Sequence, residues 1–295
     1  MPELPEVETV RARLEPRLVG RSFEHVEIVD PRLTRPNDPV GLAAELEGER
    51  VAALDRRGKY LIVRFESGRV LLIHLRMTGQ LLLVNGRAGK AATASTDGIA
   101  SDASDGGPPP AEDVHRRAVV RLDDGSDVVY RDVRRFGTWQ LLDQDDLTPY
   151  LAQRVGQEPL VRSFTSMRLA EALAGRRAPL KSALLDQRRL AGVGNIYADE
   201  ALWRARLHPL RPAGELSTAE IAALHRGIRS ALRAGIARQG ATLSNYRTPD
   251  GSPGRMQEEF RVYGREGEPC ERCGTPIEKI RAAGRGTWYC PFCQH

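Results

Sequence analysis

The sequence has 295 residues and lacks the features that define several protein classes. Only four residues are cysteines, and aromatic residues make up 5% of the chain. No uncharged apolar run approaches the roughly 20 residues of a membrane-spanning helix. The N-terminal segment is acidic and has no apolar stretch of the kind found in secretory signals. These absences argue against a membrane protein and against a disulfide-rich secreted protein, and we expect a cytoplasmic one.

What is present is the composition of a folded, basic protein. Hydrophobic residues account for 41% of the chain, which is ordinary for a globular protein, and the length suits two or three domains. Lysine and arginine number 44 against 39 acidic residues, and the isoelectric point is near 9.2. A basic isoelectric point is one property of nucleic-acid-binding proteins.

Short apolar runs separated by glycines predict β-strands in the first half of the chain. They cover residues 51–54, 60–65, 70–75, 80–84, 118–122, 128–130 and 139–142. Asp123-Asp124-Gly125 is typical of a hairpin turn, and we expect both groups of strands to belong to one sheet system. Between the groups, residues 85–113 consist almost entirely of Ala, Gly, Asp, Ser, Thr and Pro. That composition predicts a disordered insertion.

The second half of the chain has the spacing of helices. Residues 166–173, 179–190, 195–205 and 217–239 are rich in Ala, Leu and Arg at helical intervals. The residues that follow Ser217 are typical of a helix start. A glycine-containing turn over residues 191–194 separates two of these helices, and Asn195 opens the second of them.

The four cysteines predict a structural zinc site. Cys270-x2-Cys273 and Cys290-x2-Cys293 are separated by sixteen residues, which is the spacing of a four-thiolate Zn2+ site with each pair on a tight turn. Four protein ligands leave no position for a reacting water, so we expect one structural ion. The segment between the pairs is expected to form a hairpin that carries cations, among them Arg285, suited to phosphate contact.

The N-terminus has the chemistry of a nucleophile. Pro2 follows the initiator Met1, whose removal would expose a secondary amine. An α-amino group titrates near pH 7.7–8.0, so a large share is neutral and able to attack C1′ of a sugar. Glu3 and Glu6 supply carboxylates for acid/base work beside it. On these residues alone, an ordinary terminus that enters a helix is the more plausible interpretation.

Several motifs together change that balance. They are Pro2-Glu-Leu-Pro-Glu-Val-Glu-Thr, Arg57-Gly-Lys-Tyr-Leu, His74-Leu-Arg-Met-Thr-Gly, Arg134-Arg-Phe-Gly, Gly192-Val-Gly-Asn-Ile-Tyr-Ala and Gly284-Arg-Gly-Thr-Trp-Tyr-Cys-Pro-Phe-Cys-Gln. Their order and spacing resemble the formamidopyrimidine-DNA glycosylase family along nearly the whole chain, with the insertion outside the match.

The resemblance implies an α+β fold with two lobes. The N-terminal lobe is a β-sandwich with flanking helices, and the C-terminal lobe is helical, with a helix-two-turn-helix motif and a zinc β-hairpin. The expected domains are residues 1–148 (catalytic), 149–243 (helix-two-turn-helix), 244–258 (a lesion-covering loop) and 259–295 (zinc finger). The implied partner is double-stranded DNA with oxidised bases, bound by a monomer in the cleft between the lobes.

The resemblance also implies a reaction and its residues. The family excises oxidised purines, chiefly 8-oxoguanine and formamidopyrimidines, and then cuts the abasic strand by β,δ-elimination. Pro2 matches the nucleophile, Glu3 its acid/base partner and Lys59 the lysine credited with β-elimination. Arg285 matches the hairpin arginine that binds phosphate and is linked to δ-elimination. Glu6 matches a nearby family position, where a capping or orienting role is equally consistent.

Catalysis on a base requires that the base leave the stack and that the gap be filled. The residues that match the inserted set are Met77, Arg134 and Phe136. Those that align with other DNA contacts are His115 and Arg176, with Lys181 and Asn195 as phosphate ligands. His74 is either a further contact or a packed strand histidine.

Two alternatives remain open at this point. One is a sister glycosylase of the same fold that acts on oxidised pyrimidines. The other is a non-catalytic protein that binds damaged DNA, against which the presence of Pro2, Glu3 and Lys59 argues.

Overall fold

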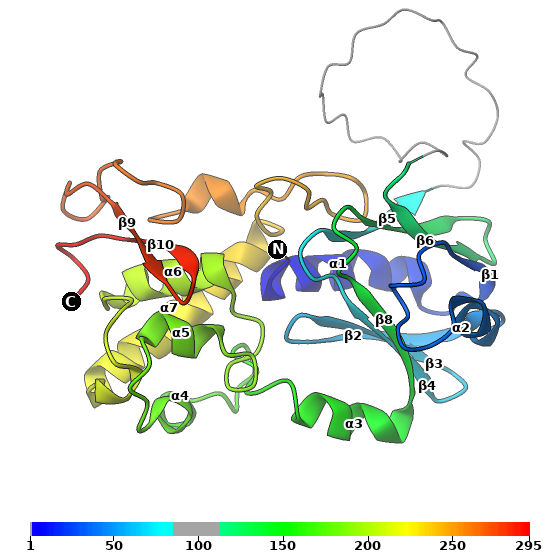
Figure 1. Cartoon of the computed structure of the whole chain (residues 1–295), viewed down its shortest axis with the longest axis horizontal. Coiled ribbons are helices and arrows are strands. Elements are labelled where there is room, and N and C mark those ends of the chain that lie inside the picture. Colours follow the sequence, from blue (N-terminus) through cyan, green and yellow to red (C-terminus); the bar gives the residue numbers. More distant parts are fainter. Residues whose placement is uncertain (1, 85–112) are drawn as a thin grey trace, which may run out of the picture.

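The computed structural model describes residues 2–84 and 113–295 and has two lobes, with the N-terminus between them (Figure 1). Most of the predicted insertion lies outside the described residues. Its last residue, Asp113, does not: the Asp113 carboxylate lies 2.6 Å from the Arg131 guanidinium. Asp113 therefore has a fixed partner, in contrast to the disorder predicted for it.

The N-terminal lobe is built on two four-stranded antiparallel sheets. The first has the order β1 (Phe23–Ile28), β6 (Arg116–Leu122), β7 (Asp127–Asp132), β5 (Gly79–Val84). The second has the order β2 (Val51–Arg57), β3 (Tyr60–Phe65), β4 (Arg69–His74), β8 (Thr138–Asp143). Side chains from both sheets share one buried core, which makes the lobe a sandwich.

The seven predicted strands are all present and belong to one sandwich, in which each sheet contains strands of both groups. β5 leaves the first group of strands to pair with β7, and β8 returns to pair with β4. Strand β1 was not predicted because only Phe23 and Val26 of its six residues are buried, so the sequence does not alternate.

Three helices flank the sandwich. Helix α1 (Leu4–Leu18) begins with a reciprocal capping box between Glu3 and Glu6 and packs a buried stripe against β2. Its first residue, Leu4, instead enters the core of the C-terminal lobe. Helices α2 (Pro39–Leu46) and α3 (Gln144–Ala152) were not predicted, and the domain boundary expected at residue 148 falls inside α3.

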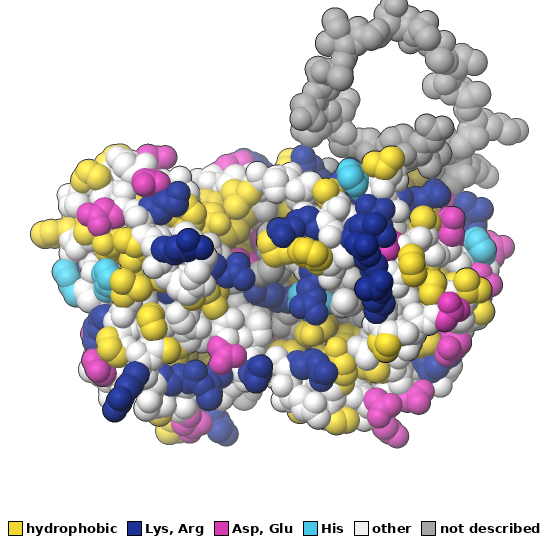
Figure 2. Space-filling model, viewed as in Figure 1, with side chains coloured by type: hydrophobic (Ala, Val, Ile, Leu, Met, Phe, Trp, Pro, Cys, Tyr) yellow, Lys and Arg dark blue, Asp and Glu magenta, His cyan; other side chains and the backbone are white. Residues whose placement is uncertain are grey.

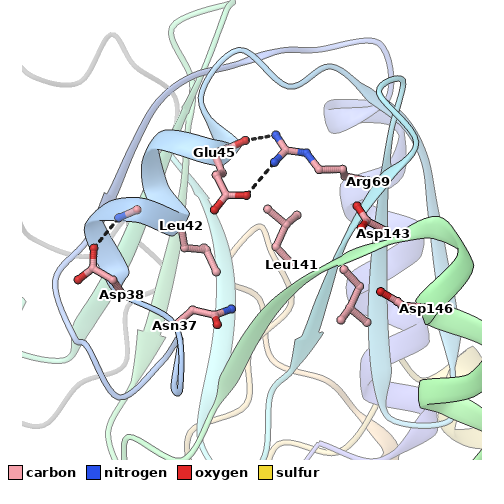
Figure 3. Close-up of a pocket in the computed structure, with 10 residues that line it drawn as sticks. Asn37, Asp38, Leu42, Glu45, Arg69, Leu141, Asp143 and Asp146 are labelled. Carbon is pink, nitrogen blue, oxygen red and sulfur yellow. Dashed lines mark hydrogen bonds and ion pairs between the residues drawn. The ribbon is translucent and has the colours of Figure 1, made fainter.

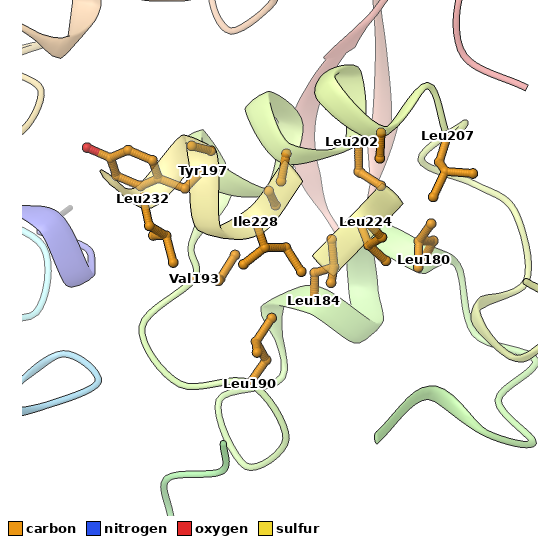
Figure 4. Close-up of a cluster of buried hydrophobic side chains, with 14 of the residues drawn as sticks. Leu180, Leu184, Leu190, Val193, Tyr197, Leu202, Leu207, Leu224, Ile228 and Leu232 are labelled. Atoms are coloured by element: carbon orange, nitrogen blue, oxygen red, sulfur yellow. The ribbon is translucent and has the colours of Figure 1, made fainter. Parts of the chain in front are cut away.

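The C-terminal lobe is a small helical bundle. It contains α4 (Ser166–Leu173), α5 (Leu180–Leu185), α6 (Asn195–Ala205) and α7 (Thr218–Ala237). Figure 4 shows leucines of α5, α6 and α7 facing one another around Ile228. The helices predicted at 166–173 and 195–205 are confirmed, and the predicted start at Ser217 is a capping box with Glu220.

The helix predicted over residues 179–190 is wrong beyond Leu185. The Asp186 carboxylate accepts the Arg188 N–H at 3.1 Å and folds the chain into a turn. The Gln187 side chain then binds both the N–H of Gly192 and the carbonyl of Val193. These side-chain bonds stabilise a loop in place of the last part of the predicted helix.

The chain ends in the predicted hairpin, β9 (Glu278–Ala282) paired with β10 (Arg285–Tyr289). Two single-turn 3-10 helices, Ala213–Glu215 and Met256–Glu259, complete the lobe. Among the helices of the described segments, none is long and apolar enough to cross a membrane.

Candidate active site

Glu3 joins the two lobes. Its carboxylate accepts backbone N–H groups of Gly194 at 2.7 Å, Ile196 at 3.0 Å and Tyr197 at 3.3 Å, all at the start of α6. Only 1% of Glu3 is exposed. The N–H groups of a helix start and the helix dipole favour a negative charge there. The predicted acid/base residue is thus held rigidly by the opposite lobe.

Glu6 lies one helical turn further along α1 and is fully enclosed. Its oxygens accept the Glu3 N–H, the Tyr197 hydroxyl and the Ala241 N–H, each at 2.8 Å. Burial and the nearby charge of Glu3 raise the pKa of Glu6. With its acceptors used in this way, Glu6 caps α1 and anchors the chain at Ala241, which suits the orienting role.

Pro2 is buried at the junction and lines a small cavity. Glu6 and Met77 form part of the wall, and Ser244 and Tyr246 face them from the predicted lesion-covering loop. The candidate nucleophile therefore lies between the acid/base residues and the segment expected to cover a damaged base.

Lys59 lies in the turn between β2 and β3 and is 5% exposed. Burial lowers the pKa of Lys59, while the charges of Glu3 and Glu6 raise it and that of Arg285 lowers it further. The four predicted catalytic residues thus meet at one place, with Arg285 exposed at the tip of the zinc hairpin. A lysine with a lowered pKa is more available as a neutral amine than one in water.

Glu158 holds the Lys59 turn in place and was missed by sequence reasoning. It is buried in the segment between the lobes, where it accepts the Gly58 N–H at 2.9 Å and pairs with Arg56 at 2.7 Å. A single glutamate in a loop has no local pattern that marks it, so the sequence offered no means of finding it.

A broad groove of about 800 Å³ opens beside Lys59. Figure 2 shows dark-blue basic side chains gathered around the hollow between the lobes. Four arginines of the groove have no carboxylate partner among residues 2–84 and 113–295: Arg32, Arg35, Arg76 and Arg134. Unpaired arginines suit phosphate groups. Only Arg134 of the four was predicted.

His74 also lines this groove. Its Nδ1 accepts the Arg76 N–H at 3.0 Å, and its ring stands edge-on to Tyr60. Burial, with the charges of Arg76 and Lys59, lowers the pKa of His74 to about 3. The histidine is packed on its strand and faces the groove as a neutral group, and its predicted contact with DNA stays a prediction.

The three residues expected to fill a gap in the duplex lie together at the groove. Phe136 is 52% exposed despite its size, and the Arg134 guanidinium lies 4.8 Å from the centre of its ring. Met77 lines the same groove from the β4–β5 loop. An exposed aromatic side chain on a short loop suits insertion between bases.

The placement of Lys181 overturns its predicted role as a phosphate ligand. The side chain is fully buried, and its Nζ binds Asp199 at 2.7 Å, the Thr287 hydroxyl at 2.8 Å and the Gly286 carbonyl at 3.0 Å. An ammonium group with three internal partners has no donor left for DNA. Lys181 instead fastens the zinc hairpin to α5 and α6.

The other predicted contacts occupy separate places. Asn195 also binds the Gly286 carbonyl, at 3.1 Å, and so lies beside Arg285. Arg176 is half-buried with Asp186 at 3.8 Å, and His115 is half-buried beside Asp113. Their roles in DNA binding stay predictions.

The four cysteines fit one zinc ion. Their sulfur atoms all lie within 4.8 Å of one another, and tetrahedral Zn–S bonds of about 2.3 Å place sulfurs about 3.8 Å apart. The Trp203 Nε1–H points to Cys270 Sγ at 3.5 Å, which suits a sulfur with negative charge. The predicted structural zinc site with ligands Cys270, Cys273, Cys290 and Cys293 is confirmed.

A second cavity, of about 440 Å³, lies between α2 and β8 (Figure 3). Its lining is acidic, and its one arginine, Arg69, is occupied by Glu45 and Glu49. None of the predicted catalytic or DNA-binding residues lines it, so this cavity is separate from the active site.

Known proteins match this chain over its full length. Three family models match in succession: the formamidopyrimidine-DNA glycosylase N-terminal domain over residues 1–139, its H2TH domain over residues 155–247, and the zinc finger found in FPG and IleRS over residues 267–295. The formamidopyrimidine-DNA glycosylase of Symbiobacterium thermophilum is 46% identical over 296 aligned residues, which cover 100% of this chain and 89% of that protein.

Solved structures of Lactococcus lactis Fpg are similar throughout. A mutant bound to DNA that contains Fapy-dG aligns with TM-score 0.84 and 38% identity over 100% of both chains. A complex with abasic-site DNA gives 0.84 and 37% over 99% of both, and one with DNA that contains an oxidised pyrimidine gives 0.83 and 38% over 100% of both. The predicted α+β architecture is thereby confirmed. The chain belongs to the formamidopyrimidine-DNA glycosylase family, and it is a DNA-repair glycosylase.

Proposed function

We propose that this protein excises oxidised purines from duplex DNA and then cleaves the abasic strand by β,δ-elimination. The observation that carries the proposal is the meeting of Pro2, Glu3, Lys59 and Arg285 at the junction of the lobes. Two carboxylates, a lysine of lowered pKa and an exposed arginine around one N-terminal residue suit amine chemistry on a sugar.

The first step uses the amine of Pro2, freed by removal of Met1. Its nitrogen attacks C1′ as the bond from C1′ to the base breaks, and the departing base takes a proton from water. The proton of the Pro2 amine passes to the Glu3 carboxylate, which delivers it to the ring oxygen O4′, so that the sugar opens and leaves an iminium joined to Pro2. Hydrogen bonds from the start of α6 fix the position of the Glu3 carboxylate relative to the reacting sugar.

The second step breaks the strand. Neutral Lys59 takes a proton from C2′, and the phosphate on O3′ leaves. Loss of the C4′ proton then expels the phosphate on O5′, with Arg285 as its binding partner. Water finally hydrolyses the iminium and frees Pro2. Burial of Lys59, which lowers its pKa, supports its part as the base.

The duplex is proposed to lie along the groove lined by the unpaired arginines. Met77, Arg134 and Phe136 fill the space left by the damaged base. His115, Arg176 and Asn195 contact the backbone, and residues 244–258 cover the lesion. Because all these groups come from one chain, the protein acts as a monomer, in the compartment that holds the DNA.

Borohydride trapping tests the chemistry. The protein, with Met1 removed, is mixed with a duplex that contains 8-oxoguanine opposite cytosine and is reduced, and a covalent adduct is expected. Pro2→Gly should slow the formation of this adduct. Lys59→Gln should still release the base but cleave the strand about 100-fold more slowly. Absence of an adduct with any oxidised base would reject the proposed Schiff base on Pro2 and the β,δ-elimination that follows from it.

A release assay tests the choice of substrate. Duplexes with 8-oxoguanine and with thymine glycol are compared at equal protein concentration, and faster release of 8-oxoguanine is expected. The complex of L. lactis Fpg with an oxidised pyrimidine makes this comparison necessary. A strong preference for thymine glycol would identify the protein as the pyrimidine-directed alternative.

A further inference from the structure

Asp132 occupies the point where two loops of the groove meet. It is the last residue of β7 and is 1% exposed. Its carboxylate accepts the Thr78 hydroxyl at 2.5 Å, the Gly137 N–H at 2.8 Å and the Arg134 N–H at 3.2 Å. One loop carries Met77 and the other carries Arg134 and Phe136, so a single carboxylate binds both.

The Thr78 hydroxyl closes the connection between these loops. It donates to Asp132 and accepts the Arg134 N–H at 2.9 Å, although Thr78 and Arg134 are 56 residues apart in the chain. The three groups form a closed set of hydrogen bonds around the buried Asp132 carboxylate, and hydrogen bonds to a charged acceptor are stronger than those between neutral groups.

Tyr130 forms the floor under both loops. It lies two residues before Asp132 on β7 and therefore on the same face of the strand. A Cβ atom on Gly79 would lie 2.5 Å from the Tyr130 hydroxyl, and one on Gly137 would lie 1.7 Å from it. If either loop moved away from Tyr130, it would lose its hydrogen bonds to Asp132.

Each loop also has a backbone that needs outside support. Arg76 has φ of 53° and Arg135 has φ of 60°, the left-handed region that residues with a Cβ atom seldom adopt. Such conformations persist when the surrounding contacts determine them. The Arg76 N–H is held by His74 Nδ1 and the Arg135 guanidinium by Asp30. The bonds to Asp132 and Thr78 hold residues one or two positions away in each loop.

We propose that Asp132, through Thr78, is a positioning residue that sets Met77 against Arg134 and Phe136 so that all three enter the duplex together. This inference rests on the proposed function, because it concerns the step in which a base is replaced in the stack. If the two loops were no longer held together, the protein would insert these side chains poorly. The sugar chemistry at Pro2 and Lys59 would remain in place.

Two substrates separate the insertion of side chains into the duplex from the sugar chemistry. The first is an 8-oxoguanine duplex with 2-aminopurine beside the lesion, which reports unstacking by fluorescence. The second is a single-stranded oligonucleotide with a preformed abasic site, which needs no base replaced. Thr78→Val and Asp132→Asn should each slow excision from the duplex at least tenfold and reduce the fluorescence change, whereas cleavage of the single strand should stay within about twofold of wild type.

Further variants test the hydrogen bond between Thr78 and Asp132. Thr78→Ser keeps the hydroxyl and should restore excision. The double variant Thr78→Val with Asp132→Asn should be no slower than the slower single variant, because both remove the same connection. Asp127→Asn is the matched control on the same strand, since that carboxylate binds Arg121 at 3.0 Å and touches neither loop.

Either of two results would overturn the inference: wild-type excision by Thr78→Val, or an equal loss on both substrates. If the wild-type protein releases no base from any duplex, the proposed function fails instead, and the two failures are thereby distinguished.

Discussion

The Glu3 carboxylate fills the space that a side chain on Gly194 would need. Its Oε2 accepts the Gly194 N–H at 2.7 Å, and a Cβ atom on Gly194 would lie 2.3 Å from Glu3 Cδ. The glycine turn of the C-terminal lobe is therefore shaped around a residue of the N-terminal lobe. The position of the Glu3 carboxylate and the docking of the lobes depend on the same contact.

Gly194→Ala should displace the Glu3 carboxylate and slow base excision about 100-fold, since a shift of about 1 Å in a reacting group has effects of that size. Single-turnover excision from an 8-oxoguanine duplex measures the effect. Gly41→Ala is the control, because Gly41 is exposed on α2 and a Cβ atom there is 3.4 Å from its nearest neighbour. Equal rates for both variants would show that the close contact has no role in positioning Glu3.

The low pKa of His74 predicts that stability falls in mild acid. The folded protein keeps His74 neutral down to about pH 3, whereas the unfolded chain takes up a proton near pH 6.5. Between these values the unfolded state binds more protons, so the free energy of unfolding decreases as pH falls, by at most about 1.4 kcal/mol per unit.

His74→Asn removes this titration and retains an acceptor for the Arg76 N–H. The decrease in unfolding free energy between pH 7 and pH 5 should then be about 1–2 kcal/mol smaller than in wild type. Urea unfolding at both pH values provides the measurement. An identical decrease in both proteins would contradict the prediction.

Lys181 and Asp199 form a fully buried ion pair in which each side chain compensates the charge of the other. Burial lowers the pKa of Lys181 and raises that of Asp199. Lys181→Met leaves Asp199 without its partner and should lower stability by about 3–5 kcal/mol, seen as a fall of about 10 °C in thermal unfolding.

The double variant Lys181→Met with Asp199→Asn tests the cause. It removes both charges and keeps an acceptor for the Trp288 N–H, which Asp199 binds at 3.1 Å. It should recover more than half of the lost thermal stability. If the double variant is no more stable than Lys181→Met alone, the unpaired charge is not the reason for the loss.

The zinc site is expected to support DNA binding from a distance. Cys273→Ala should release the metal and loosen the hairpin that holds Arg285, so that affinity for a duplex with an abasic-site analogue falls at least tenfold. Zinc content and duplex affinity are measured on the same sample. Phe292→Ala is the control, because Phe292 is 66% exposed in the turn of the other cysteine pair and supplies no ligand. Loss of zinc with unchanged affinity would contradict this expectation.

The elements that follow a local pattern were predictable from the sequence. Seven of the eight strands of the sandwich and the zinc hairpin have regular apolar or cysteine spacing, and the structure contains them. The helix beyond Leu185 was predicted wrongly because side chains of Asp186 and Gln187 bond to backbone groups outside the helix. Helical spacing alone does not reveal such competition.

The candidate site was predictable only where a motif marked it. Pro2, Glu3 and Lys59 follow the family pattern, but the same pattern assigned Lys181 to phosphate, whereas its partner is Asp199 on another helix. Glu158 and Asp132 are single acids in ordinary surroundings, and their importance comes from partners about 100 and 54 residues away. Contacts of that range depend on the packing of the whole fold.

The position of Glu3 and Glu6 also has a consequence for the timing of synthesis. These residues are among the first to be translated, yet their N–H partners lie at Gly194, Ile196, Tyr197 and Ala241. A nascent chain shorter than 241 residues lacks part of that set, even if the β-sandwich has already folded. On the proposed mechanism, Glu3 and Glu6 reach their positions only after both lobes have been made and joined, so we expect an unfinished chain on the ribosome to be inactive.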